Sequence, residues 1–244
     1  MKKFTPFSFL LLFLLPGTAA WSQDCSQYLF LQQGKTIEVT SYNKKGEPNG
    51  KNVYTVSNVS NSGGTITGTL SSQMFDKKDR PTNTSTSTVK CTGGAFQMDM
   101  KFMLPDGPAG RMSSAQVSGS GGILEYPLGM KAGDTLKNGN IVLTNSSNNS
   151  APGGPPPPPN PFSGGGSTLS MWIYERHVIG QESVTTTAGT WNCLKITYKS
   201  KVNYKSGPFP APNINIDVTE WYAPGVGIIK TQSDRGSTAI TSIK

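Results

Sequence analysis

Residues 194–199 read Leu-Lys-Ile-Thr-Tyr-Lys, and this stretch decides the fold class. Its apolar and polar side chains alternate, so a strand here turns Leu194, Ile196 and Tyr198 to one side and the polar residues to the other. The same alternation returns at 214–218. A helix would need apolar residues three and four positions apart, and the mature chain has almost no such pattern. These stretches therefore predict β-strands with one buried face and one wet face.

Strand signals of this kind continue in both directions, with turn residues between them. Asn138-Gly139, between Leu136 and Ile141, predicts a two-residue hairpin turn. About a dozen strands joined by short turns predict an all-β fold, either an antiparallel sandwich or an open barrel. The strands that we expect lie at 36–40, 53–56, 64–75, 84–91, 94–103, 168–179, 194–199, 214–218 and 226–232.

One turn sequence occurs twice. Residues 42–48 (YNKKGEP) and 75–81 (FDKKDRP) match position for position. Asn, Asp, Gly and Pro favour turns, so both copies predict exposed hairpin tips. Two interpretations stay open, namely contact with an anionic envelope surface or two similar solvated hairpins. Contact with such a surface would use Lys44, Lys45, Lys77 and Lys78.

The N-terminus has the three parts of a secretory signal peptide. Two lysines precede an apolar run at 7–15, and small residues follow it. Cleavage after Ser22 fits the preference for small residues at the cleavage site, and cleavage after Ala20 is the alternative. No lipobox precedes Cys25. We therefore expect residues 1–22 to be removed, leaving a periplasmic or secreted protein that is not integral to the membrane.

Three cysteines remain in the mature chain: Cys25, Cys91 and Cys193. In an oxidising compartment two of them usually form a disulfide, which leaves one thiol. We expect the pair Cys25–Cys91, because this bridge would hold the mature N-terminus, and a buried Cys193 within a strand. A reactive Cys193 is the alternative, although no histidine lies near it in the sequence.

The positive charge of the chain is moderate and dispersed. The formal net charge is +8, and removal of Lys2 and Lys3 leaves +6. Nucleic-acid binding usually needs a concentrated basic patch with aromatic residues that stack on bases. We therefore expect no nucleic-acid partner.

Residues 145–167 interrupt the strand pattern. They read NSSNNSAPGGPPPPPNPFSGGGS, with five consecutive prolines and no charged residue. This composition predicts a disordered loop, inserted into a single β domain at 23–244. A recognition peptide and a boundary between two domains are the alternative interpretations.

Candidate catalytic groups are few. His177 is the only histidine, and it lacks the His or Cys partners of a metal site. The chain has no Gly-x-Ser-x-Gly motif. The spacing of Glu125, Glu182 and Glu220 selects no catalytic pair of acids. We expect no enzymatic activity, cofactor or metal, and a hydrolase built on His177 or on paired acids is the remaining alternative.

Four stretches follow one another in a specific order. They lie at 34–46, 124–136, 188–196 and 220–227. This series resembles the TapB-like family of exported proteins of Gram-negative bacteria, which has no assigned function. The resemblance implies an all-β envelope protein and brings no catalytic residues with it. The proline-rich insert departs from the family pattern.

Six aromatic residues on the expected strands are candidates for a binding site. They predict a cavity for an apolar or amphipathic ligand, such as a lipid of the envelope. An ordinary packed core is the alternative, and so is an interaction module that uses the lysine tips or the proline-rich loop. The six residues are Trp172, Tyr174, Trp191, Tyr198, Trp221 and Tyr222.

Overall fold

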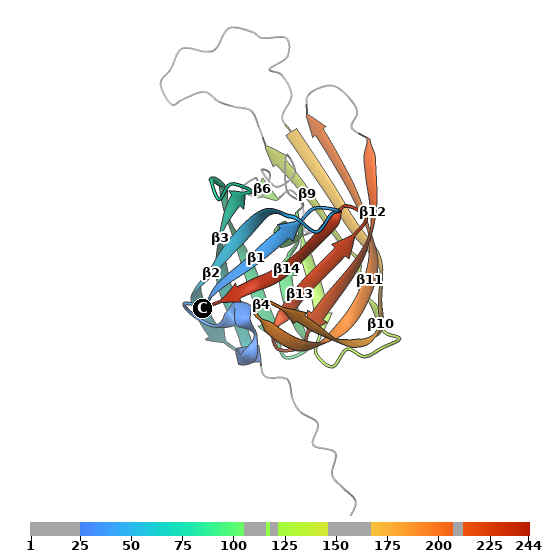
Figure 1. Ribbon diagram of the computed structural model, residues 1–244. Helices are drawn as coiled ribbons and strands as arrows, with labels where there is room; N and C mark the ends of the chain where they lie inside the picture. The colour runs from blue at the N-terminus through green and yellow to red at the C-terminus, as the bar shows by residue number, and fades with distance from the viewer. Residues whose placement is uncertain (1–24, 105–115, 118–121, 146–166, 207–211) are drawn as a thin grey trace, which may run out of the picture.

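Fourteen strands form one antiparallel sheet that curls into a nearly closed barrel (Figure 1). The computed structural model describes residues 25–104, 116–117, 122–145, 167–206 and 212–244. The first seven strands are β1 (Thr36–Tyr42), β2 (Pro48–Ser62), β3 (Thr65–Asp76), β4 (Pro81–Thr92), β5 (Ala95–Asp99), β6 (Gln116–Val117) and β7 (Ile123–Pro127). The others are β8 (Thr135–Leu136), β9 (Gly139–Asn145), β10 (Ser167–Thr186), β11 (Gly189–Ser206), β12 (Asn213–Ala223), β13 (Gly227–Ser233) and β14 (Gly236–Ile243).

The sheet order confirms the all-β prediction and selects the barrel over the sandwich. From edge to edge the order is β6-β9-β10-β11-β12-β13-β14-β1-β2-β3-β4-β5-β7, and β8 pairs with β10 beside this path. The last strand, β14, therefore pairs with the first strand, β1, in the middle of this order. Within the described residues no backbone ladder joins the edge strand β7 to β6 or to β9, the strand next to β6. A Cβ added at Gly139 would lie 2.6 Å from a methyl carbon of Leu124, so glycine at the start of β9 allows the two edges to approach.

Two short 3-10 helices, η1 (Cys25–Gln27) and η2 (Leu29–Leu31), plug one end of the barrel. A disulfide joins Cys25 to Cys91 on β4, which is the pairing expected from the sequence. Phe30 is fully buried, and a Cβ at Gly227 would lie 3.0 Å from its ring. Glycine at that position therefore makes room for the plug.

Aromatic rings connect the plug to the barrel wall. Tyr28 stacks on Phe96 with 4.3 Å between ring centroids, and its hydroxyl accepts a 2.9 Å hydrogen bond from Tyr222. Tyr222 stacks in turn on Tyr126 at 4.5 Å. Burial of such large rings is the main stabilising contribution at this end.

Strands β10, β11 and β12 lie side by side and are long (Figure 1). The turn between β10 and β11 reaches the outer side of β14, where the Thr187 hydroxyl donates a 2.8 Å hydrogen bond to the Thr241 carbonyl. Cys193 lies in this hairpin, free and buried. Burial raises its thiol pKa to about 11, so the thiolate needed for reactivity is disfavoured.

A β-bulge in β10 changes which side chains face the interior. Glu175 has a positive φ of 54°, and the pairing with β11 shifts between Tyr174 and His177. Before the bulge Ile173 is buried, and after it Arg176 is buried while His177 is exposed. Simple alternation from Ile173 would have turned His177 inward and Arg176 outward, so the bulge places Arg176 inside.

Two expectations about local structure are wrong. Asn138-Gly139 does not form a hairpin turn, because β8 and β9 both pair with β10 instead of with each other. The expected strand at 94–103 ends at Asp99, since the Asp99 carboxylate accepts a hydrogen bond from the Lys101 amide and starts the 3-10 helix η3 (Met100–Met103).

The two repeated turns are confirmed as hairpin tips of the same geometry. The side chain of Asn43 accepts hydrogen bonds from the amides of residues 45 and 47, and the side chain of Asp76 accepts them from the amides of residues 78 and 80. Gly46 and Asp79 take the left-handed conformation at the same position, with φ of 79° and 57°. The four lysines of these tips are exposed.

Two expectations concern segments outside the described residues. The signal peptide at 1–22 lies before the first described residue, and the proline-rich insert at 145–167 falls almost wholly within the undescribed 146–166. Among the described residues, no helix is both long and apolar enough to cross a membrane.

Candidate functional site

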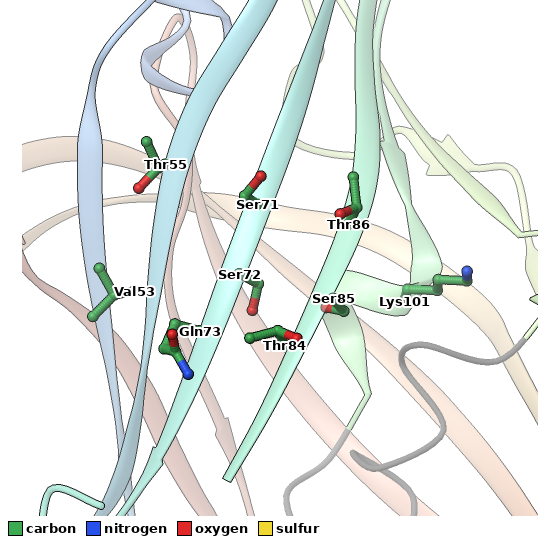
Figure 2. Close-up of a pocket in the computed structure, with 9 residues that line it drawn as sticks. All are labelled: Val53, Thr55, Ser71, Ser72, Gln73, Thr84, Ser85, Thr86 and Lys101. Carbon is green, nitrogen blue, oxygen red and sulfur yellow. The ribbon is translucent and has the colours of Figure 1, made fainter. Parts of the chain in front are cut away.

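A hollow of about 600 Å³ lies along β2, β3 and β4 (Figure 2). Six of its nine lining residues carry hydroxyl groups, and a seventh is Gln73. We call this lining the serine–threonine wall. It consists of Val53, Thr55, Ser71, Ser72, Gln73, Thr84, Ser85, Thr86 and Lys101.

Strand pairing arranges the wall in cross-strand rows. Thr55, Ser71 and Thr86 are register partners in one row. Neighbouring strands lie about 4.8 Å apart, so the hydroxyls of a row repeat at roughly this spacing. In Figure 2 the Lys101 side chain extends away from the strands, and the groups facing the hollow from the strands are uncharged. The wall can therefore offer several neutral donors and acceptors to one ligand.

The other face of the same strands is more apolar. Next to Ser72 and Ser85 lie Met74, Phe102 and Leu104, which together with Tyr54 line a small gap of about 10 Å³. Side chains therefore almost fill the interior at this level. The wall thus has hydroxyl groups on one side and aromatic and aliphatic groups behind it.

A second polar feature lies inside the barrel, among β7, β10 and β12. Arg176 is 1% exposed, and one guanidinium nitrogen donates hydrogen bonds to the carbonyls of Glu125 (3.1 Å) and Lys137 (2.8 Å). Its guanidinium carbon also lies 4.9 Å from the ring centroid of Tyr126. Glu220 is fully buried, and the hydroxyls of Tyr126 and Tyr198 lie close to its carboxylate without completing a hydrogen bond of standard geometry.

Burial raises the pKa of Glu220 from its ordinary 4.5 to about 7. The positive charge of Arg176 opposes this rise, and so does hydrogen bonding by the phenols of Tyr126 and Tyr198. Burial also holds the pKa of both phenols well above 10. The three groups therefore act on one another electrostatically inside a low-dielectric interior.

The structure does not bring the six predicted aromatic residues together. Tyr198 and Tyr222 are buried inside the barrel, 5% and 1% exposed. Trp172 lies between the buried residues 171 and 173, so it points outward, and it is 38% exposed. Tyr174 and Trp191 are only partly buried. The six residues therefore do not line one common surface, because Tyr198 and Tyr222 face the interior whereas Trp172 and Trp221 face outward.

Trp221 lies on the outer face, between Glu220 and Tyr222, which both point inward. Lys195 and Lys230 lie 5.5 and 5.0 Å from its ring, and its indole N–H donates to the Glu182 carboxylate. Trp221 is only 9% exposed, because Glu182 and Lys195 of the β10–β11 hairpin cover its ring, while these two side chains stay partly exposed. Glu182 therefore has a structural partner.

The remaining catalytic candidates lie apart. His177 is exposed, and its Nδ1 lies 3.2 Å from the Thr135 hydroxyl. Glu125 forms a 2.8 Å ion pair with Lys137. In the part of the chain that the structure describes, no three His, Cys, Asp or Glu residues gather as a metal site would require.

Sequence reasoning missed both polar sites. The serine–threonine wall had a signal, because Ser or Thr occupies consecutive positions, and so both faces of the strand, at 71–72 and 84–88. The interior position of Arg176 had none, since it depends on the bulge at Glu175.

Fold and site define a plugged antiparallel β-barrel with a hydroxyl-lined wall. The chain belongs to the DUF3108-like family, whose model matches residues 32–243. No curated protein matches its sequence.

Two solved structures share the fold. One is a candidate exported protein with a YmcC-like fold from Bacteroides fragilis, 21% identical, with a TM-score of 0.69 over 87% of this chain and 96% of that one. The other is a candidate lipoprotein from Parabacteroides distasonis, 20% identical, with a TM-score of 0.69 over 89% of this chain and 99% of that one.

Proposed function

We propose that this protein is a non-catalytic exported protein of the TapB-like type, which binds an amphipathic envelope ligand at the serine–threonine wall. The observation that carries the proposal is the 600 Å³ hollow lined by six hydroxyl side chains. Neutral donors and acceptors in rows suit the hydroxylated or amide part of a ligand. Val53, which also lines the hollow, and the methyl groups of the lining threonines suit the apolar part of the ligand.

Export is supported by two features of the chain. The N-terminal sequence has the pattern of a signal peptide, and the first described residue, Cys25, is in a disulfide. A cysteine sulfur engaged in a disulfide is not available for a lipid thioether, which favours the soluble exported form over a lipoprotein.

The test is native mass spectrometry of protein purified from the periplasm, with lipid extraction of the same sample. We expect a bound species that Thr86→Tyr removes, since the larger ring fills the hollow. Thr88→Tyr is the matched control, because Thr88 lies on the same strand and face, two residues away and outside the lining. A mass without ligand in the wild-type protein, or a bound species that Thr86→Tyr leaves in place, contradicts the proposal.

The twin hairpin tips favour a second candidate function, an interaction module for an anionic partner. Register pairs Gly50 with Asp76, so the two tips lie at the same end of neighbouring hairpins. Lys51 links them further through a 3.0 Å ion pair with Asp79. Replacing the four exposed tip lysines by glutamine would abolish binding to anionic vesicles under this proposal, and unchanged binding would exclude it.

A further inference from the structure

Three buried side chains inside the barrel carry polar atoms that complete no hydrogen bond of standard geometry, although the hydroxyls of Tyr126 and Tyr198 lie close enough to Glu220 to lower its pKa. Arg176, Glu220 and Tyr126 come from β10, β12 and β7 and are at most 1% exposed. The unsatisfied atoms are Nε and Nη2 of Arg176, both carboxylate oxygens of Glu220 and the Tyr126 hydroxyl. Buried polar atoms in native proteins nearly always have a hydrogen-bond partner, protein or water. Five such atoms in one region therefore have hydrogen-bonding capacity that a group from outside the chain can complete.

These atoms belong to one cluster. The guanidinium of Arg176 lies over the Tyr126 ring, and both groups shift the pKa of Glu220. Yet among the described residues Arg176 forms no ion pair, so its charge does not contact the carboxylate directly. Donors on the guanidinium and acceptors on the carboxylate thus lie near each other without an ion pair, and the Tyr126 hydroxyl lies close to both.

The chemistry of the cluster restricts what fits between these groups. An anion would be repelled by Glu220 in its charged form, and a cation would be repelled by Arg176. An apolar group would leave the polar atoms unsatisfied at a cost. A neutral hydroxyl group accepts from the guanidinium and donates to the carboxylate at the same time.

We propose that Arg176, Glu220 and Tyr126 form an internal binding site for a neutral hydroxyl group, supplied by ordered water or by a small hydroxylated ligand. Water suits such a site because it makes two to four hydrogen bonds to otherwise unsatisfied buried groups. The site lies among β7, β10 and β12, whereas the serine–threonine wall lies on β2, β3 and β4. It is therefore separate from the proposed ligand site.

The test is a crystal structure of the mature protein at a resolution that shows ordered water. We expect density within about 2.7–3.2 Å of a Glu220 oxygen and an Arg176 nitrogen. A single spherical peak identifies water. Extended density, together with a small extra mass in native mass spectrometry, identifies a hydroxylated ligand. A direct hydrogen bond between Arg176 and Glu220, or ordered side chains with no density between them, overturns the proposal.

Three variants test whether the density depends on these residues or is ordinary bound water. Glu220→Gln keeps an acceptor, so the density should remain. The double variant Arg176→Met with Glu220→Leu removes the charged pair together, so no uncompensated charge is left, and the density should disappear. Glu175→Gln is the control, because it removes only the exposed ion pair with Lys199. Density that persists unchanged in the double variant would show that these residues do not build the site.

Discussion

The inward-facing side chains of β3 and β4 differ in polarity between the two ends of these strands. Toward the plug their inward residues are apolar, as at Leu70 and Val89, both fully buried. One inward position further along each strand, Ser72 and Ser87 take their place, each 8% exposed. The plug end therefore has the apolar packing that stabilises the fold, whereas the other end, which we call the polar end, has buried hydroxyl groups among its apolar side chains. The following predictions test this division, from the largest expected effect to the smallest.

The disulfide should be the strongest single restraint on the plug end. Replacing Cys25 and Cys91 by serine opens a loop of 66 residues, and the chain-entropy model gives a loss of about 4 kcal/mol in the free energy of unfolding. Urea unfolding of the double variant measures the loss. Cys193→Ala, which leaves the bridge intact, is the control, and a loss no larger than that of the control would show that the plug does not depend on the bridge.

Two truncations on β3 compare the ends directly. Leu70→Ala removes a buried side chain at the plug end and should lower the free energy of unfolding by about 2–5 kcal/mol. Ser72→Ala, two residues along the same face, should change it by less than about 1 kcal/mol. Equal losses in urea unfolding would mean that the polar end carries as much stability as the plug end.

Glu220 should make stability depend on pH. It lies one inward position along β12 from Tyr222, which contacts the plug, so it sits between the two ends. Its pKa is raised by burial from 4.5 to about 7, so the folded state binds the proton more tightly than the unfolded state. Its contribution is therefore complete below about pH 4.5 and is lost as the pH rises through 7, a change of about 3 kcal/mol.

The check is the free energy of unfolding of wild type and Glu220→Gln from pH 4 to 8. The difference between the two proteins should slope across this window, with Arg176, Tyr126, Tyr198 and Tyr222 as the neighbouring groups. Glu182→Gln is the control, because the pKa of this more exposed carboxylate is lowered and its titration should not give the same slope between pH 4.5 and 7. A flat difference would show that Glu220 is ionised alike in both states.

The twin tips at the polar end should give the smallest effects. Gly46→Ala forces a side chain into the left-handed conformation and should cost about 1 kcal/mol. Asp79→Gly relieves that conformation but loses the exposed ion pair with Lys51, so the net change should stay within about 0.5 kcal/mol. Thermal unfolding compares both, and a larger loss for Asp79→Gly would mean that the ion pair holds the tips together.

The fold followed from patterns that are local in the sequence. Alternation at 194–199 predicted a strand, the repeated turn predicted two tips, and many short strands predicted a barrel or sandwich. The internal polar site could not be predicted in this way, because a bulge changes which side chains of β10 face inward. The bulge at Glu175 turns Arg176 inward, and the alternation at Trp221 turns its ring outward. Alternation predicts that Trp221 and Tyr222 face opposite sides but not which of them faces inward, and the bulge depends on pairing with the neighbouring strand.

The pairing of β1 with β14 has a consequence for the order of folding. Thr36 and Lys244 exchange two backbone hydrogen bonds, at 3.0 and 2.9 Å, so the first strand finds its partner only when the last strand is present. Contacts so distant along the chain form slowly. Until β14 arrives, β1 and β13 each present an unpaired edge, and such edges promote association with other chains. A growing chain therefore stays vulnerable to aggregation until its final segment has been made.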